Sequence, residues 1–253
     1  MTPIIAAAGL RQAFGSRVIF SEVSFTVQPG EVFVILGGSG CGKSVLMRQI
    51  IGLLPPVAGT VQVLGQDMYA AATDIRTRIG VMFQAGALFG SMTLLENVML
   101  PLELLSDLPY AARVALARVK LGLVGLAESA EKMPSEISGG MAKRAAIARA
   151  MALDPPLLLL DEPSAGLDPI TSAGLDRLIL DLRDELGITF VVVTHELASI
   201  LAIADRCLML DAAAAGVIAS GDPRSLAAES THPTVRAFFH REATARPSRT
   251  IGI

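Results

Sequence analysis

A glycine-rich segment that ends in a lysine and a serine carries the clearest chemical signal in the sequence. It follows a strand-like stretch, residues 31–36, and precedes a helix-like stretch, residues 45–51. In that setting the pattern GxxxxGK[ST] predicts a loop whose backbone N–H groups surround phosphate oxygens, with a helix N-terminus directed at the same phosphates. We expect Lys43 to reach the β- and γ-phosphates and the Ser44 hydroxyl to ligate Mg²⁺. The phosphate loop comprises Gly37, Gly38, Ser39, Gly40, Cys41, Gly42, Lys43 and Ser44.

Two carboxylates end a second apolar stretch. Residues 157–160 are four leucines, and Asp161 and Glu162 follow them directly. Because ligands collect at the carboxyl ends of parallel strands, we expect these acids to lie near the phosphate loop. There Asp161 can hold Mg²⁺ through water, while Glu162 can orient an attacking water and accept its proton. The alternative is a pair of solvated carboxylates at a strand end.

Two further polar residues follow strand-like stretches. Gln84 comes after residues 79–83, and its neutral amide can ligate Mg²⁺ or hold water without adding charge. His195 comes after residues 188–193 and Thr194, and its imidazole can hydrogen-bond a γ-phosphate oxygen and the attacking water. Each is, taken alone, also consistent with an ordinary polar loop residue. His232 and His240 have no comparable placement, and we expect them at the surface.

The order of elements predicts how these residues are positioned. Fully apolar strands that alternate with helices, such as the helix at 173–186, indicate a parallel sheet buried on both faces. Residues 88–152 are Ala/Leu-rich with helical spacing and form a helical insertion; within residues 111–121 we expect Val119 to be buried and Lys120 to face water. The predicted strands are residues 18–27, 31–36, 60–64, 79–83, 157–160, 188–193 and 207–210.

Composition excludes several classes of protein. The 253 residues carry 21 Lys and Arg against 24 Asp and Glu, a net charge of −3, which argues against a dedicated nucleic-acid binder. No uncharged run approaches the roughly 18 residues of a membrane span, and the first residues lack a signal-peptide pattern. Cys41 and Cys207 form no metal-type pair and fit a reducing compartment. We therefore expect a cytosolic globular chain.

A fourth motif connects the others to a known family. Residues 137–141 precede a helix-like stretch, 141–153, in which Ser138 suits the N-cap and the glycines allow a phosphate to approach. With this motif the sequence resembles an ATP-binding cassette (ABC) ATPase over nearly its whole length. The resemblance implies an α/β P-loop NTPase fold with a RecA-like core, an antiparallel β subdomain and an inserted α-helical subdomain. In that family the signature, here Ser138, Gly139, Gly140 and Met141, completes the nucleotide site of a partner copy in a head-to-tail dimer.

The resemblance also implies residue roles and the ligands ATP and Mg²⁺. It gives Phe14 the adenine-stacking position, Gln84 the Q-loop, Glu162 the catalytic base and His195 the switch histidine. Residues 164–168 match the D-loop, which crosses between subunits. Met141 departs from the Gln that most of the family has there.

Residues 83–89, 138–141 and 167–171 look like those of Mla-type ATPases, in which a Met-containing signature is usual. These proteins serve phospholipid trafficking, so the resemblance implies two copies beneath membrane permease subunits, on the cytoplasmic face of the bacterial inner membrane. A STAS-domain protein and a substrate-binding lipid-carrier protein are further candidate partners; nucleic acid is not. The implied organisation is one ATPase domain, residues 1–240, with a helical subdomain at about 87–152 and a C-terminal tail, residues 241–253.

The expected mechanism is ATP-driven dimerisation that moves a permease. Residues 84–92 border a predicted groove, and Phe83, Leu88, Phe89 and Met92 are apolar enough to receive a permease helix; the alternative is that these four belong to the core. An ABC importer for amino acids or another small solute would share the same motifs. A soluble ABC ATPase acting on DNA or ribosomes and a P-loop kinase fit the sequence less well, and the sequence does not reveal the cargo.

Overall fold

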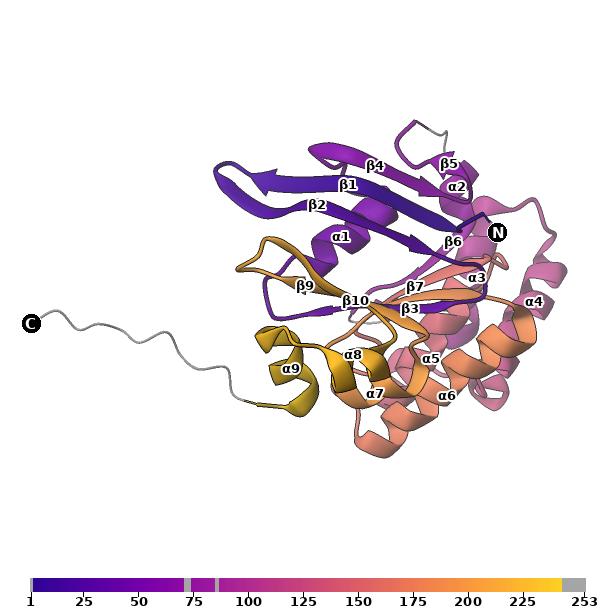
Figure 1. Cartoon of the computed structure of the whole chain (residues 1–253). Coiled ribbons are helices and arrows are strands. Elements are labelled where there is room, and N and C mark those ends of the chain that lie inside the picture. Colours follow the sequence, from indigo (N-terminus) through magenta and orange to yellow (C-terminus); the bar gives the residue numbers. More distant parts are fainter. Residues whose placement is uncertain (1, 71–73, 85–86, 243–253) are drawn as a thin grey trace, which may run out of the picture.

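A computed structural model describes residues 2–70, 74–84 and 87–242 of the chain. The described strands form two sheets, one above the other in the view of Figure 1. The smaller sheet is antiparallel, in the order β2-β1-β4-β5. Its strands are β1 (Ile5–Phe14), β2 (Arg17–Val27), β4 (Ala58–Val63) and β5 (Gln66–Asp67).

The larger sheet has the strand order β10-β9-β3-β8-β7-β6. All neighbouring strands in it run parallel except β9 and β10. Four parallel strands therefore end side by side at one edge, in the order β3, β8, β7, β6. The strands are β3 (Val32–Gly37), β6 (Ile79–Met82), β7 (Leu157–Asp161), β8 (Thr189–Val193), β9 (Arg206–Asp211) and β10 (Gly216–Gly221).

Helices cover both faces of the larger sheet. Helix α1 (Lys43–Ile50) lies between the two sheets, and α5, α6 and α7 lie on the opposite face (Figure 1). Between β6 and β7 the chain forms α3 (Leu94–Leu105), α4 (Tyr110–Leu123), the short turns η1 (Ala127–Ser129) and η2 (Pro134–Glu136), and α5 (Gly139–Ala150). The remaining helices are α2 (Asp74–Thr77), α6 (Pro169–Leu186), α7 (Leu197–Ile203), α8 (Pro223–Glu229) and α9 (Pro233–His240).

Alternating side chains of the central strand β3 enter two separate cores. Phe33 and Ile35 pack with the antiparallel sheet and α1, and the Phe33 ring stacks on Phe25 with 5.4 Å between ring centroids. Val34 and Leu36 pack on the other side, with the helices. Successive side chains of a strand point to opposite faces, so an all-apolar strand needs cover on both. The prediction of a parallel α/β sheet buried on both faces is confirmed.

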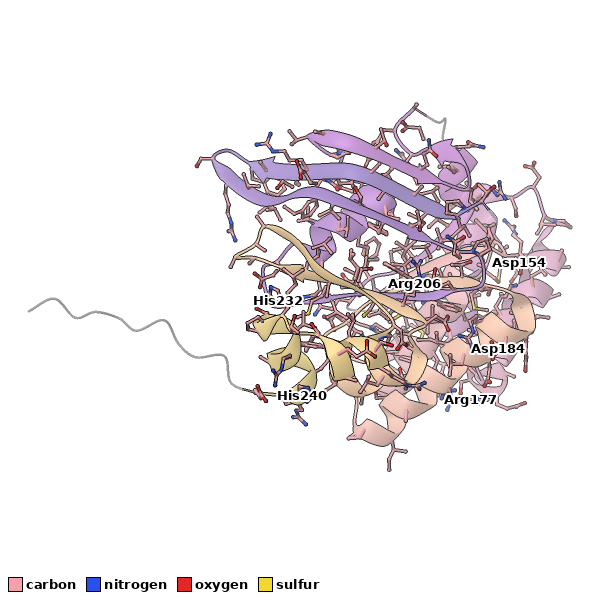
Figure 2. All side chains as sticks on the ribbon, viewed as in Figure 1. Asp154, Arg177, Asp184, Arg206, His232 and His240 are labelled. Atoms are coloured by element: carbon pink, nitrogen blue, oxygen red, sulfur yellow. The ribbon has the colours of Figure 1, made fainter. Side chains whose placement is uncertain are left out.

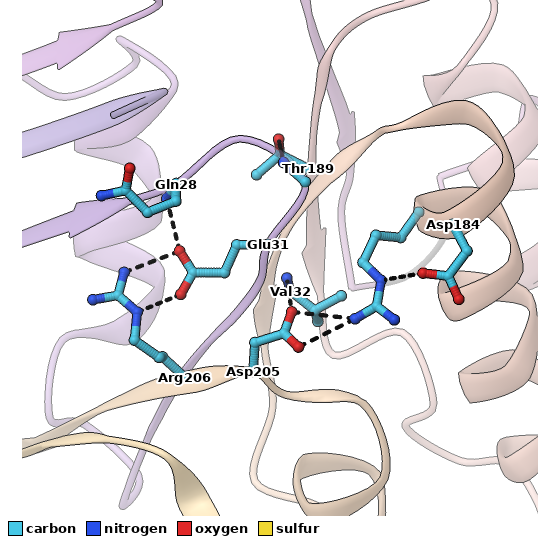
Figure 3. A network of polar contacts seen from close by, with 9 residues as sticks. Gln28, Glu31, Val32, Asp184, Thr189, Asp205 and Arg206 are labelled. Carbon is cyan, nitrogen blue, oxygen red and sulfur yellow. Dashed lines mark hydrogen bonds and ion pairs between the residues drawn. The ribbon is translucent and has the colours of Figure 1, made fainter. Parts of the chain in front are cut away.

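A polar network ties the amino ends of the strands together, at the edge opposite the one that carries the predicted site (Figure 3). Glu31 is buried and accepts from the Arg206 guanidinium, with 2.9 Å between Nη2 and Oε2. Asp205 accepts from the Val32 backbone N–H at 2.8 Å and from Arg183 of α6 at 3.2 Å. Because each bond joins residues far apart in sequence, the network fixes how β3, β9 and α6 meet.

The predicted strands agree with the structure to within two residues at each end, whereas helices begin earlier than predicted. Capping residues decide these starts: Ser138 accepts from the backbone N–H of Met141, and Asp168 accepts from those of Ile170 and Thr171. Such caps satisfy N–H groups that have no partner inside the helix, so the helix starts directly after the cap. Strands β1, β5 and β10 were not predicted; the alanine-rich sequence of β1 has low strand propensity.

The predicted exposure of two residues in α4 is wrong. Val119 is 57% exposed, and Lys120 is only 5% exposed. Lys120 buries its aliphatic stem and forms an ion pair with Asp154, a residue labelled in Figure 2. The partner that permits this burial follows α5, far away in sequence, so helical periodicity alone could not reveal it.

His232 and His240 are exposed, as predicted, and lie at the two ends of α9 (Figure 2). No helix among the described residues is long and apolar enough to cross a membrane. Most of the predicted tail, from residue 243 onward, lies outside the described residues, as do residues 85 and 86 next to Gln84.

Candidate nucleotide site

The four predicted site segments lie at one edge of the larger sheet. Gly37 ends β3, His195 lies two residues beyond β8, Asp161 ends β7 and Gln84 lies two residues beyond β6. Because β3, β8, β7 and β6 are neighbours and parallel, these residues share the carboxyl edge of the sheet. This is the edge at which open α/β sheets bind ligands.

The phosphate loop joins β3 to α1 in a conformation that requires glycine. Gly42 has φ +104°, and a Cβ at this position would come within 2.8 Å of side-chain atoms of Ile19 and Phe20. The Lys43 ammonium folds back over the loop and donates to the backbone oxygens of Gly37 at 2.8 Å and Gly38 at 3.2 Å. The positive charge of Lys43 therefore lies beside the backbone of the phosphate loop. Gly38, Ser39, Gly40 and Ser44 are exposed.

Cys41 within this loop is buried, and burial raises the pKa of its thiol. The thiol is therefore neutral near pH 7 and serves as a small packing group of the loop.

An open pocket of about 350 Å³ extends from the phosphate loop to the end of β1. Phe14 and Ile19 supply its apolar wall, and Gly40, Lys43 and Ser44 supply its polar wall. The Phe14 ring is half exposed. An exposed ring beside a phosphate loop can stack on a flat base whose phosphates occupy the loop. Arg17 also lines the pocket and was not predicted, because only the antiparallel pairing of Phe14 with Arg17 places it there.

Asp161 and Glu162 occupy different environments. Burial raises the pKa of the Asp161 carboxyl and the charge of Glu162 adds to this, whereas the cations Lys43, Arg48 and Lys143 oppose it. Glu162 is 7% exposed and has φ +48°, so the chain turns sharply off the strand at this residue. Its backbone N–H donates to the Val193 oxygen of β8 at 2.8 Å, which holds the turn.

One oxygen of the Glu162 carboxylate contacts a histidine and the other is buried. Oε1 lies 2.8 Å from Nδ1 of His195. Oε2 is buried and has no hydrogen-bond partner among the described residues. A buried carboxylate oxygen normally accepts a hydrogen bond, so Oε2 is an unsatisfied acceptor in this arrangement. The His195 side chain is 63% exposed and remains open to a ligand.

The signature segment packs against α6 of its own chain, the helix that follows the D-loop residues 164–168. Gly140 lies so close to α6 that an added Cβ would overlap Cγ2 of Thr171. The Thr171 hydroxyl in turn donates to the Asp168 side chain at 2.5 Å. In the described part of the chain, no hydrogen bond or ion pair joins residues 138–141 to residues 37–44. The signature instead contacts α6 of its own copy, through Gly140 and Thr171.

Gln84 is exposed, and its backbone oxygen accepts from the Lys143 ammonium at 2.5 Å. Lys143 is a second residue that the sequence analysis missed. Its position on α5 is the only sequence signal that could have singled it out.

Oxygen donors suit Mg²⁺ at this edge of the sheet. Ser44, Gln84 and Asp161 offer a hydroxyl, an amide and a carboxylate. Mg²⁺ usually binds one or two carboxylates together with substrate phosphates and water, so it needs no dense protein cage. The described residues accordingly contain no group of three or more His, Cys, Asp or Glu side chains able to hold a metal.

Two of the four apolar residues predicted to receive a permease helix are exposed. Phe83 and Phe89 are exposed, and the Arg149 guanidinium lies 5.9 Å from the centre of the Phe89 ring. Leu88 and Met92 are partly buried. Docking of a permease helix here stays a prediction.

Comparisons with known proteins show which family the chain resembles. The ABC transporter family matches residues 20–165, more than half of the chain. The intermembrane phospholipid transport system ATP-binding protein MlaF of Escherichia coli K12 is 42% identical over 229 residues, which cover 89% of this chain and 84% of that protein. The probable ribonucleotide transport ATP-binding protein mkl of Mycobacterium tuberculosis H37Rv is 41% identical over 240 residues, covering 93% of this chain. The chain spans 66% of the length of that relative.

Solved structures show the same architecture. CbiO1 from Clostridium perfringens, part of the ABC transporter complex cbiONQ, superposes with a TM-score of 0.83 at 27% identity, covering 90% of this chain and 92% of that one. The bacterial ABC transporter cassette MJ0796, solved as a dimer, superposes with a TM-score of 0.76 at 30% identity, covering 86% and 98%. Both the expected P-loop fold and the resemblance to ABC ATPases are confirmed: the chain belongs to the ABC transporter family.

Proposed function

We propose that this chain is the ATP-hydrolysing subunit of an ABC transporter that moves phospholipid across the bacterial envelope. The contact between Glu162 and His195, beside the phosphate loop, supports hydrolysis rather than nucleotide binding alone. Similarity to MlaF and the Met141 signature support a phospholipid cargo. The name of the mycobacterial relatives favours a small-solute cargo as the second candidate.

Two copies act together, head to tail. The MJ0796 dimer supports this arrangement, and within the described part of one copy no hydrogen bond or ion pair joins residues 138–141 to residues 37–44. Each ATP is held between one copy's phosphate loop and the other's signature, Ser138, Gly139, Gly140 and Met141. The γ-phosphate contacts both copies, so its release on hydrolysis lets the dimer open.

The chemistry is an in-line attack of water on the γ-phosphate. The Glu162 carboxylate accepts the proton of that water, and His195 orients this carboxylate through Oε1. Lys43 neutralises charge that develops on the phosphate oxygens. Mg²⁺, when bound, supplies a further positive charge, and Ser44, Gln84 and Asp161 would hold it. Phe14 stacks on the adenine ring.

The motor works beneath membrane permease subunits, as a peripheral protein on the cytoplasmic face of the inner membrane. Its ATPase domain comprises residues 1–240, with the helical subdomain at about 87–152, and the tail is 241–253. A STAS-domain protein and a lipid-carrier protein are candidate additional partners.

The test is to purify the protein from detergent-solubilised membranes and to identify both its partner chains and any bound lipid. Recovery of a permease with phospholipid, together with Mg²⁺-dependent phosphate release from ATP, is the expected result. A permease that carries a solute-binding subunit and no lipid would favour the small-solute candidate. Absence of phosphate release from the complex would overturn the motor itself.

A further inference from the structure

Lys143 of α5 contacts the backbone of two site segments at once. Its ammonium donates to the Gln84 oxygen at 2.5 Å and to the Glu162 oxygen at 3.4 Å. Gln84 follows β6 and Glu162 follows β7, and these strands are neighbours. One side chain therefore links the ends of both strands to the helix that begins with the signature.

The Lys143 ammonium that makes these two contacts is charged and partly buried. Burial lowers the pKa of Lys143, whereas the negative charges of Glu162 and Asp161 raise it. Hydrogen bonds from an ammonium are stronger than those from neutral donors, more so where water is partly excluded. The Lys143 ammonium thus holds two carbonyls and faces two carboxylates.

The backbone of Glu162 has an unfavourable conformation that its surroundings must hold in place. Its positive φ of 48° is unfavourable for a residue with a side chain, and such conformations persist only where the surroundings hold them. The Glu162 N–H donates to the Val193 oxygen, and its carbonyl oxygen accepts from the Ala165 N–H at 3.2 Å and from Lys143 at 3.4 Å. Among the described residues, loss of the Lys143 contact leaves this carbonyl bonded within its own turn, to Ala165, and removes its link to α5.

We propose that Lys143 is a positioning residue that keeps the Glu162 turn and the Q-loop aligned with the signature helix. Lys143 lies within the second turn of α5, and Ser138 caps the same helix. A short helix is rigid over this length. The turn that presents the water-activating carboxylate of one site therefore moves together with the signature that serves the other site. The inference rests on the proposed function, because it assumes hydrolysis by a dimer.

The experiment compares two neutral variants, Lys143→Met and Lys143→Gln, with the charge-retaining variant Lys143→Arg. Lys132→Met removes an exposed lysine of the same inserted segment and is the matched control. Steady-state phosphate release gives kcat and KM, and a fluorescent ATP analogue gives the Kd for nucleotide. Thermal melting shows that each protein is folded.

We expect both neutral variants to lower kcat about tenfold or more, the effect of losing a hydrogen bond from a charged group. Nucleotide Kd stays within about twofold, because Phe14 and the phosphate loop are untouched. Lys143→Arg recovers most of the kcat, and Lys132→Met resembles the wild type.

Three results would overturn the proposal. One is a kcat within twofold of the wild type in a folded neutral variant. Another is a change confined to KM or Kd, which would place Lys143 in nucleotide binding. The third is a folded Lys143→Arg protein as slow as Lys143→Met, since charge would then not be what positions the turn. A wild-type protein that releases no phosphate would overturn the proposed function and this inference with it.

Discussion

Oε1 of Glu162 lies 2.8 Å from Nδ1 of His195, and the two residues follow neighbouring parallel strands, β7 and β8. The pair is assembled by strand order, since 32 residues separate its members in sequence and the register of β7 with β8 brings Asp161 opposite Val193. It also orients the carboxylate. The histidine contacts Oε1, whereas Oε2 is buried and has no hydrogen-bond partner among the described residues.

Replacing this carboxylate by an amide should separate binding from hydrolysis. We expect Glu162→Gln to lower kcat about 10²–10⁴-fold, because an amide cannot accept the proton of the attacking water. ATP binding should persist, and ATP should hold the variant as a dimer. Phosphate-release assays and size-exclusion chromatography with ATP measure the two effects. Normal turnover by Glu162→Gln would remove Glu162 from the role of base.

The contact between the signature and α6 predicts that alanine substitutions at the adjacent residues Gly139 and Gly140 differ in their effect on stability. An added Cβ at Gly140 would overlap Thr171, whose hydroxyl is already bonded to Asp168, so the side chain cannot rotate away without losing that bond. We expect Gly140→Ala to lower the free energy of unfolding by about 1–2 kcal/mol, overpacking outweighing the better helix propensity of alanine.

Gly139→Ala is the matched control, because a Cβ there would lie 3.8 Å from Leu167, an ordinary contact. It should leave stability unchanged or slightly raised. Urea unfolding of both variants tests the difference. Equal stabilities of Gly140→Ala and Gly139→Ala would contradict the close approach of α5 and α6.

Asn97 organises the segment that follows the Q-loop. It is fully buried; its side-chain oxygen accepts from the Phe89 N–H at 2.8 Å, and its amide donates to the backbone oxygens of Phe89, Met92 and Thr93. We expect Asn97→Ala to cost about 2–3 kcal/mol, because these backbone groups lose their partner. Urea unfolding measures the loss. Ser91→Ala, at an exposed position of the same segment, should cost little, and a similar cost for both would be evidence against this role of Asn97.

Asp176 of α6 predicts a pH-dependent contribution to stability. Burial raises the pKa of this carboxyl above its ordinary value of 3.8, the nearby Ser199 hydroxyl opposes the shift, and the charge of Glu196 adds to it. Between the unfolded and the folded pKa, the folded state keeps a proton that the unfolded chain has released. Stability therefore falls as pH rises through this window.

Asp176→Asn removes that dependence. The free energy of unfolding of the variant, relative to that of the wild type, should therefore increase as pH rises from about 4 and then become constant. Glu185→Gln, an exposed acid on the same helix, should follow the wild-type profile. Urea unfolding at several pH values tests this. A constant difference between wild type and Asp176→Asn at all pH values would show that the carboxyl does not titrate abnormally.

Local sequence was sufficient for seven of the ten described strands, the phosphate loop and the residues at the strand ends. Apolar runs such as 157–160 identify buried strands wherever they pack, and a glycine-rich loop between a strand and a helix has few uses other than phosphate binding. Parallel strands present their carboxyl ends together, so the grouping of Asp161, Glu162 and His195 near the loop also followed from the sequence.

Tertiary structure alone decided which side chains from other elements reach these residues. Lys120 is buried because Asp154, 34 residues further along the chain, meets it. Lys143 reaches Gln84 and Glu162 because α5 packs over the ends of β6 and β7. Periodicity reports which face of an element is apolar, whereas the partner of a charged side chain depends on the packing of distant segments, which no local pattern encodes.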